Sequence, residues 1–173
     1  MPALTEQMKL WKAHWKIERF ACESIEDVRR LDLRPYLVTE FEENIALNTG
    51  KAEIWALVIG DSAAHFDNTN ARIGVGDSST AAANTQTDLQ AAVNKAYGTM
   101  ESSYPQQSTT TTPDDTVEFQ SSFGSGDANF SWQEFVIKEN TGGVCLNRKV
   151  SDQGTKASGQ TWLITLKLQA TGS

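Results

Sequence analysis

Residues 161–168 read TWLITLKL, and this stretch decides the fold class of the chain. Its apolar side chains occupy every second position and would share one face of an extended segment: Trp162, Ile164, Leu166 and Leu168. The opposite face would carry Thr161, Thr165 and Lys167. A period of two residues is typical of a half-buried β-strand. Residues 116–123 (TVEFQSSF) alternate in the same way.

Similar short runs recur through the chain, separated by clusters of Gly, Asn, Asp, Ser and Thr. The candidate strands are 11–20, 36–42, 71–75, 95–100, 116–123, 132–138, 144–150 and 161–168. Many short strands with polar turns between them are typical of an all-β sandwich or barrel. The sequence therefore predicts a mainly β fold, an antiparallel β-sandwich of jelly-roll-like type with about eight strands.

One short helix is expected near residues 50–59, within the more apolar segment 45–59. Gly60 is suited to end it, and Gly50 would interrupt it, so one interpretation has the helix begin after Gly50 with Thr49 as its cap. Residues 1–35 are expected to form an N-terminal arm with a charged excursion. Residues 36–173 are then the sandwich domain.

Composition excludes several classes of partner. The chain has 173 residues, enough for one domain, and 15 Lys and Arg against 22 Asp and Glu give a net charge of −7. Nucleic-acid binding requires a basic face, and acidic proteins avoid anionic membranes, so neither partner is expected. The longest apolar run, residues 54–59, is far shorter than the roughly 20 residues of a membrane helix. No signal-peptide core is apparent, so we expect synthesis in a cytosol.

The sequence contains no motif that predicts catalysis. His14 and His65 lie outside any nucleophile motif, and the chain has neither a Gly-x-Ser-x-Gly elbow nor a phosphate-binding loop. Glu118 and Glu134 lie on neighbouring candidate strands, but surface carboxylates are a simpler interpretation than a glycosidase pair. Two cysteines alone, Cys22 and Cys145, cannot build a zinc site and are expected to be free thiols, and the Asp- and Asn-rich residues 61–70 match no calcium loop. We therefore expect no enzyme activity, no cofactor and no metal.

The five tryptophans fall on the apolar side of their local patterns, and core packing is expected for most of them: Trp11, Trp15, Trp55, Trp132 and Trp162. Trp11 and Trp15 are the exception, because they lie close to the N-terminus beside several lysines. The residues expected to contact a partner are Lys9, Trp11, Lys12, Trp15 and Lys16. On this hypothesis, removal of residues 1–20 abolishes attachment and leaves the sandwich folded.

Several phrases together resemble a group of small virion proteins of tailed bacteriophages. They are IALNTG (45–50), IWALVIG (54–60), NARIGVGDSST (70–80), TQTDL (85–89), YGTMESSYP (97–105), FQSSFGSGDANFSWQEF (119–135) and LNRKVSDQGTK (146–156). The resemblance covers about residues 40–168, and it depends on the order and spacing of these phrases more than on any one of them.

The resemblance implies a non-enzymatic virion structural protein, most specifically a capsid decoration (cement) protein that stabilises contacts between major capsid subunits. Its partners would be the major capsid protein and itself, as a homotrimer. It would assemble in the host cytoplasm and lie on the capsid exterior. Two alternatives remain open. One is a neck, tail, baseplate or fibre component. The other is a carbohydrate- or receptor-binding module with Tyr97, Tyr104 or Trp132 as a sugar platform.

Overall fold

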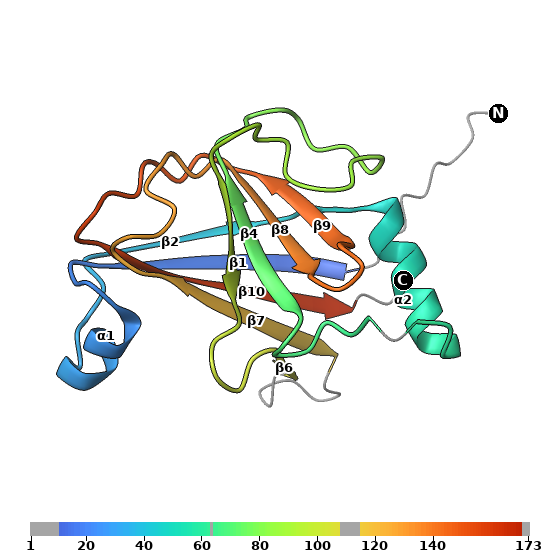
Figure 1. Ribbon diagram of the computed structural model, residues 1–173, viewed down its shortest axis with the longest axis horizontal. Helices are drawn as coiled ribbons and strands as arrows, with labels where there is room; N and C mark the ends of the chain where they lie inside the picture. The colour runs from blue at the N-terminus through green and yellow to red at the C-terminus, as the bar shows by residue number, and fades with distance from the viewer. Residues whose placement is uncertain (1–10, 63, 108–114, 171–173) are drawn as a thin grey trace.

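The chain folds as two five-stranded antiparallel sheets packed face to face (Figure 1), in a computed structural model that describes residues 11–62, 64–107 and 115–170. The first sheet has the order β2 (Leu37–Glu42), β1 (Trp11–Phe20), β10 (Thr161–Ala170), β7 (Thr116–Phe123) and β6 (Gln106–Gln107). The second has the order β3 (Ile45–Ala46), β9 (Cys145–Val150), β8 (Glu134–Glu139), β4 (Ala71–Gly76) and β5 (Lys95–Thr99).

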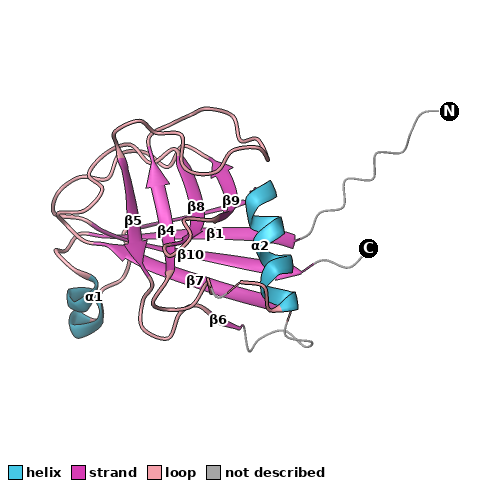
Figure 2. Cartoon of the chain, turned by 45° about the vertical axis from the view of Figure 1, so that its right-hand side comes forward, coloured by secondary structure: helices cyan, strands magenta, loops and turns pink. Residues whose placement is uncertain are grey.

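The predicted antiparallel sandwich is confirmed, and its details differ from the expectation in two ways. The described residues form ten strands and two helices, α1 (Ile25–Leu31) and α2 (Asn48–Ile59). The strand order also departs from a plain jelly roll, because four neighbouring pairs are consecutive in the chain: β1–β2, β4–β5, β6–β7 and β8–β9. The two helices lie at opposite ends of the sandwich (Figures 1 and 2).

Strand β1 lies inside the first sheet and is paired on both sides. It runs antiparallel to β10 from the pair Trp11–Ala170 to the pair Phe20–Thr161, and its other edge pairs with β2. Residues 11–20 are therefore part of the sandwich over this range and not a separable arm. Removal of residues 1–20 would take away a central strand, so the sandwich is not expected to survive it.

The core lies between the two sheets and is rich in aromatic rings. Trp132 is fully buried at its centre, with ring centroids 4.7 Å from Trp162 and 4.9 Å from Phe123 in edge-to-face arrangements. Its indole Nε1 donates to the carbonyl oxygen of Ala128 at 3.0 Å, so its polar group is satisfied. The alternation seen in the sequence therefore places the apolar face of each long strand in this core.

Helix α2 packs against β9 through Gly50, which lies within the helix and is buried. A Cβ at this position would lie 2.5 Å from the Leu146 Cα atom and 2.6 Å from its carbonyl oxygen. The helix begins at Asn48, before the glycine, and ends at Gly60, whose φ of 76° is the left-handed cap expected from the sequence. Close backbone approach therefore explains a glycine that local propensity disfavours.

We expect Gly50→Ala to lower the free energy of unfolding by about 1–3 kcal/mol, although alanine is the better helix former. The reason is steric, since the new methyl group meets the β9 backbone and not a flexible side chain. Urea unfolding measures the change. Ala52→Gly is the control on the exposed side of the same helix, where only helix propensity, up to about 1 kcal/mol, should be lost. A stabilised Gly50→Ala variant would contradict this packing.

Candidate functional site

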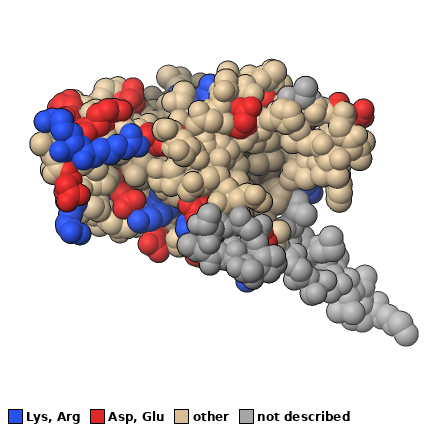
Figure 3. All heavy atoms as spheres, turned by 90° about the horizontal axis from the view of Figure 1, so that it is seen from below, with Lys and Arg blue, Asp and Glu red and all other residues tan. Residues whose placement is uncertain are grey.

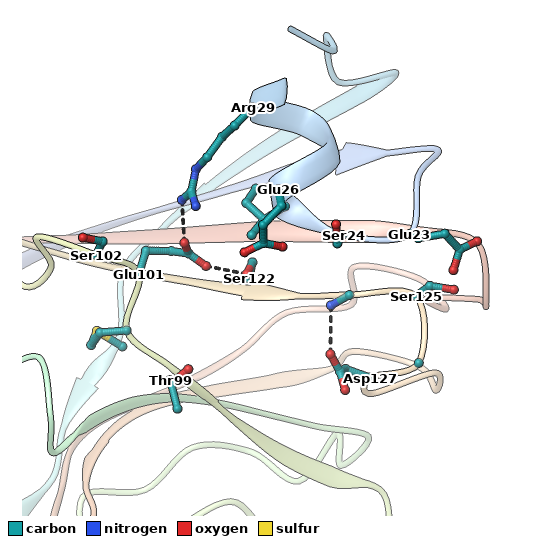
Figure 4. Close-up of a pocket in the computed structure, with 14 residues that line it drawn as sticks. Glu23, Ser24, Glu26, Arg29, Thr99, Glu101, Ser102, Ser122, Ser125 and Asp127 are labelled. Carbon is teal, nitrogen blue, oxygen red and sulfur yellow. Dashed lines mark hydrogen bonds and ion pairs between the residues drawn. The ribbon is translucent and has the colours of Figure 1, made fainter. Parts of the chain in front are cut away.

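A polar groove of about 530 Å³ opens beside α1. Its walls come from the start of α1, the segment that follows β5, the end of β7 and the turn after it (Figure 4). Ser24 caps α1 by accepting a hydrogen bond from the Asp27 backbone N–H at 3.2 Å, which places Glu26 and Arg29 at the groove. The groove thus depends on a short capped helix held against the first sheet.

Several polar groups of this groove are engaged with one another. Arg29 forms an ion pair with Glu101 at 2.5 Å, and the Ser122 hydroxyl donates to the other oxygen of Glu101. Asp127 accepts a hydrogen bond from the Gly124 backbone N–H at 3.0 Å. Among the residues that the structure describes, neither a histidine nor an aromatic ring lines the groove. Ser122 faces the Glu101 carboxylate, which is already held by Arg29, and no histidine stands among the described residues that line the groove. The described lining therefore lacks the serine–histidine pair of acyl transfer.

One wall of the groove is anchored from behind by Lys156, which is fully buried. Its ammonium Nζ donates to the Gly124 carbonyl oxygen at 2.6 Å and to Asn129 Oδ1 at 2.9 Å. Burial lowers the pKa of Lys156, and nearby Asp127 opposes that shift. These contacts hold the turn over residues 124–129, so we assign Lys156 a structural role.

Two acidic side chains stabilise the second sheet and its loops. Burial alone would raise the pKa of Asp88, but Lys138 at 2.5 Å and the Tyr97 hydroxyl at 2.7 Å hold that pKa below its ordinary value. Glu139 is buried, which would also raise its pKa, yet backbone N–H groups of the β8–β9 turn lower it. These donors are Val144 at 3.0 Å, Gly142 at 2.7 Å and Thr141 at 2.8 Å.

The lowered pKa values of Asp88 and Glu139 predict a loss of stability in acid. Folding favours the deprotonated form of each group, so their contribution is present above the ordinary carboxyl pKa of about 4 and is lost as the pH falls through the lowered values. Urea unfolding over a pH series should therefore show the free energy of unfolding decreasing below about pH 4. Glu139→Gln should make the free energy of unfolding depend less steeply on pH in this range. A stability that stays constant across this acidic range would contradict the prediction.

The structure separates the residues predicted to contact a partner. Trp15 is fully buried in the core, so it offers no surface to a partner, whereas Trp11 is half-buried and donates to Asn44 Oδ1 at 3.2 Å. Lys12 is exposed on the outer face of the first sheet, and Lys16 pairs there with Glu18 at 3.0 Å. Lys9 lies outside the described residues.

The candidate residues for enzyme and sugar sites do not come together. Glu118 lies in the first sheet and pairs with Lys167 at 2.8 Å, whereas Glu134 is buried in the second sheet beside Arg148 at 2.7 Å. Trp132 is inaccessible in the core, and the hydroxyl of Tyr97 is bound to Asp88. Tyr104 is half-buried and packs against the core cluster. No aromatic platform for a sugar ring is therefore assembled from these residues.

The most unusual surface of the molecule is on α2. Trp55, Val58 and Ile59 are 65%, 68% and 73% exposed, and Gly50 alone is buried within the helix. The run from Ile54 to Ile59 contains no charged residue. A helix that is apolar on every side is normally covered on every side. We call the exposed side chains Ala52, Trp55, Val58 and Ile59 the α2 surface.

The α2 surface corrects one sequence-based expectation. Core packing was expected for Trp55 and is wrong for it, although Trp132 and Trp162 are buried as expected. The signal was present in the sequence, because residues 54–59 are apolar at all six positions and show no polar face. In an amphipathic helix that faces a core, apolar residues recur at helical spacing and polar residues occupy the opposite face. The sequence pattern predicted the helix but did not predict that its apolar side chains are exposed.

Within residues 11–62, 64–107 and 115–170, no three His, Cys, Asp or Glu side chains gather in a way that could hold a metal ion. In the same part of the chain, no helix is long and apolar enough to cross a membrane. Comparison with protein-family models, curated proteins and solved structures finds no match for this chain.

Proposed function

We propose that this chain is a non-enzymatic structural protein of a tailed-phage virion, and most specifically a capsid decoration protein that stabilises contacts between major capsid subunits. The observation that carries an assembly role is the α2 surface, with Trp55, Val58 and Ile59 65%, 68% and 73% exposed. A contiguous apolar surface of this kind marks a site that another protein covers. The resemblance of residues 40–168 to small phage virion proteins supports the placement in a virion.

The remaining surface suits a protein that stays soluble until it assembles. The net charge of −7 favours solubility, because molecules of like charge repel one another at long range. On the outer face of the first sheet, charges are balanced by local pairs: Lys16 with Glu18 at 3.0 Å and Lys167 with Glu118 at 2.8 Å. Apolar contact at α2 therefore offers more binding energy than these exposed ion pairs, which contribute about 1 kcal/mol or less each.

The test of this proposal is the number of copies of the chain in purified virions. Quantitative mass spectrometry against the major capsid protein gives that number directly. Copies in the hundreds, in a simple ratio to capsid subunits, would support decoration of the capsid exterior. A dozen or fewer would favour the alternative, a neck, tail, baseplate or fibre component. Absence from virions would overturn the structural role.

A further inference from the structure

We propose that the α2 surface of one copy packs against the α2 surface of a second copy of this chain, as an antiparallel pair of helices around a two-fold axis near Trp55. This pairing rests on the proposed function and deepens it, since it names the first protein that covers this surface. It gives a dimer in place of the homotrimer that the resemblance implies. Its test uses the purified chain alone and does not depend on the virion.

The shape of the α2 surface suits another helix. Its exposed positions include Ala52, Trp55 and Ile59, which follow one another at spacings of three and four residues. This spacing forms a narrow stripe along a helix, the seam through which helices pack together. Val58 widens the stripe beside Ile59. A two-fold axis brings the same stripe from both copies together, so the surface need only complement itself.

The distribution of charge favours a second copy at this place. Each molecule carries −7, so two copies repel unless they meet where few carboxylates lie. On the face drawn in Figure 3, charged side chains gather over the end of the molecule that bears α1, whereas the opposite end is mostly uncharged and carries a few acidic side chains at its edge. The run 54–59 crosses this end without a charge. Electrostatic repulsion between two copies is therefore weakest when they meet at the α2 surface.

The two ends of α2 are complementary when the helices run antiparallel. Lys51 lies in the first turn of the helix, and Asp61 follows its cap, Gly60. An antiparallel pair centred on Trp55 brings Lys51 of each copy beside the Asp61 end of the other. The helix dipoles also oppose in this arrangement, so the positive N-terminal end of one helix meets the negative C-terminal end of its partner. A parallel arrangement would bring like ends together.

The oligomeric state of the whole chain tests the pairing. Light scattering coupled to size-exclusion chromatography should give twice the 19.0 kDa of one chain. Trp55→Glu and Val58→Glu should each give the single-chain mass, because both place a carboxylate in the apolar seam. Leu31→Glu is the matched control, since Leu31 is 54% exposed on α1 at the other end of the sandwich. It should remain a dimer, and circular dichroism should show that all three variants are folded.

A charge swap tests the antiparallel direction. Lys51→Glu and Asp61→Lys should each raise the dissociation constant by about two- to fivefold, as expected for exposed ion pairs, and the double variant should restore it. A monomeric wild-type chain, a dimer that survives Trp55→Glu, or dissociation by Leu31→Glu as well would overturn the proposal. A trimer would overturn the two-fold pairing. A monomer that is nevertheless present in virions would leave the proposed function standing without this contact.

Discussion

Replacing Arg148 by Met should lower the free energy of unfolding by about 3–5 kcal/mol, the cost of leaving a buried charge without its partner. Arg148 and Glu134 are both fully buried, and the Arg148 Nε and Nη2 atoms lie 2.8 and 2.7 Å from Glu134 Oε2. Methionine has a side chain of similar length but carries no charge. The substitution therefore leaves the Glu134 carboxylate in the same dry site without its cation. Urea unfolding at neutral pH measures the loss.

The same pair also holds the long segment over residues 77–94 against the second sheet. Arg148 donates to Gln86 Oε1 and to the Thr80 carbonyl oxygen, both at 2.9 Å. Glu134 accepts hydrogen bonds from the backbone N–H groups of Ala91 at 2.7 Å and Gln90 at 2.8 Å. We therefore expect limited proteolysis of Arg148→Met to begin within residues 77–94, before the sheets unfold.

Two further variants test whether the loss comes from burial of the ion pair and from the interaction between Arg148 and Glu134. Lys167→Met removes the Lys167–Glu118 pair, whose lysine is 43% exposed, and should cost no more than about 1 kcal/mol. Adding Glu134→Gln to Arg148→Met removes the stranded carboxylate, so the double variant should be less unstable than the sum of its parts. A loss below about 1 kcal/mol for Arg148→Met would show that the pair is not buried as described.

Trp15→Ala should cost about 3–5 kcal/mol of unfolding free energy, as expected for truncation of a large buried aromatic side chain. The Trp15 ring stacks on Phe41 with a centroid distance of 5.9 Å and contacts Phe135 at 5.6 Å. Its removal leaves a cavity between the sheets. Urea unfolding, with near-ultraviolet circular dichroism to follow the aromatic packing, measures the effect.

The controls separate a core role of Trp15 from contact with a partner. The indole Nε1 of Trp15 finds no hydrogen-bond partner among the described residues, so Trp15→Phe forfeits volume without losing a hydrogen bond and should cost less than Trp15→Ala. Lys12→Ala, at an exposed position on the same strand, should change stability by no more than about 0.5 kcal/mol. Unchanged stability of Trp15→Ala would show instead that Trp15 lies on a surface.

Local patterns predicted the strands well where one face of the strand is buried. The alternation over residues 116–123 and 161–168 corresponds to β7 and β10, which pair with each other from Trp162–Phe123 to Gln169–Thr116. Such patterns are readable because side chains on a strand alternate between core and solvent. The end of α2 at Gly60 was also predictable, because a glycine can adopt the left-handed cap.

The α2 surface was predicted less well, because the exposure of a side chain depends on which other elements pack over it. The sequence predicted a partner contact for Trp15 and core packing for Trp55, and both predictions are wrong. The structure buries the first between two sheets and leaves the second 65% exposed. Likewise, the contact of Arg148 with the segment over residues 77–94 has no local signal, since Thr80 lies 68 residues away in the sequence. Glu134 is only 14 residues from Arg148, but their contact depends on the register of the β8–β9 pair.

The sequence by itself determined the mainly β class, most of the strands, the helix that ends at Gly60 and the acidic surface, because periodicity, turn residues and charge are local properties. Only the tertiary structure decided that β1 is a central strand, that Gly50 lies against the β9 backbone, and that the apolar side chains of α2 remain uncovered. Those outcomes depend on which elements meet across the sandwich, and apolar side chains can be buried by many partners with similar gain in free energy. The choice among partners is made by the packing of the whole chain.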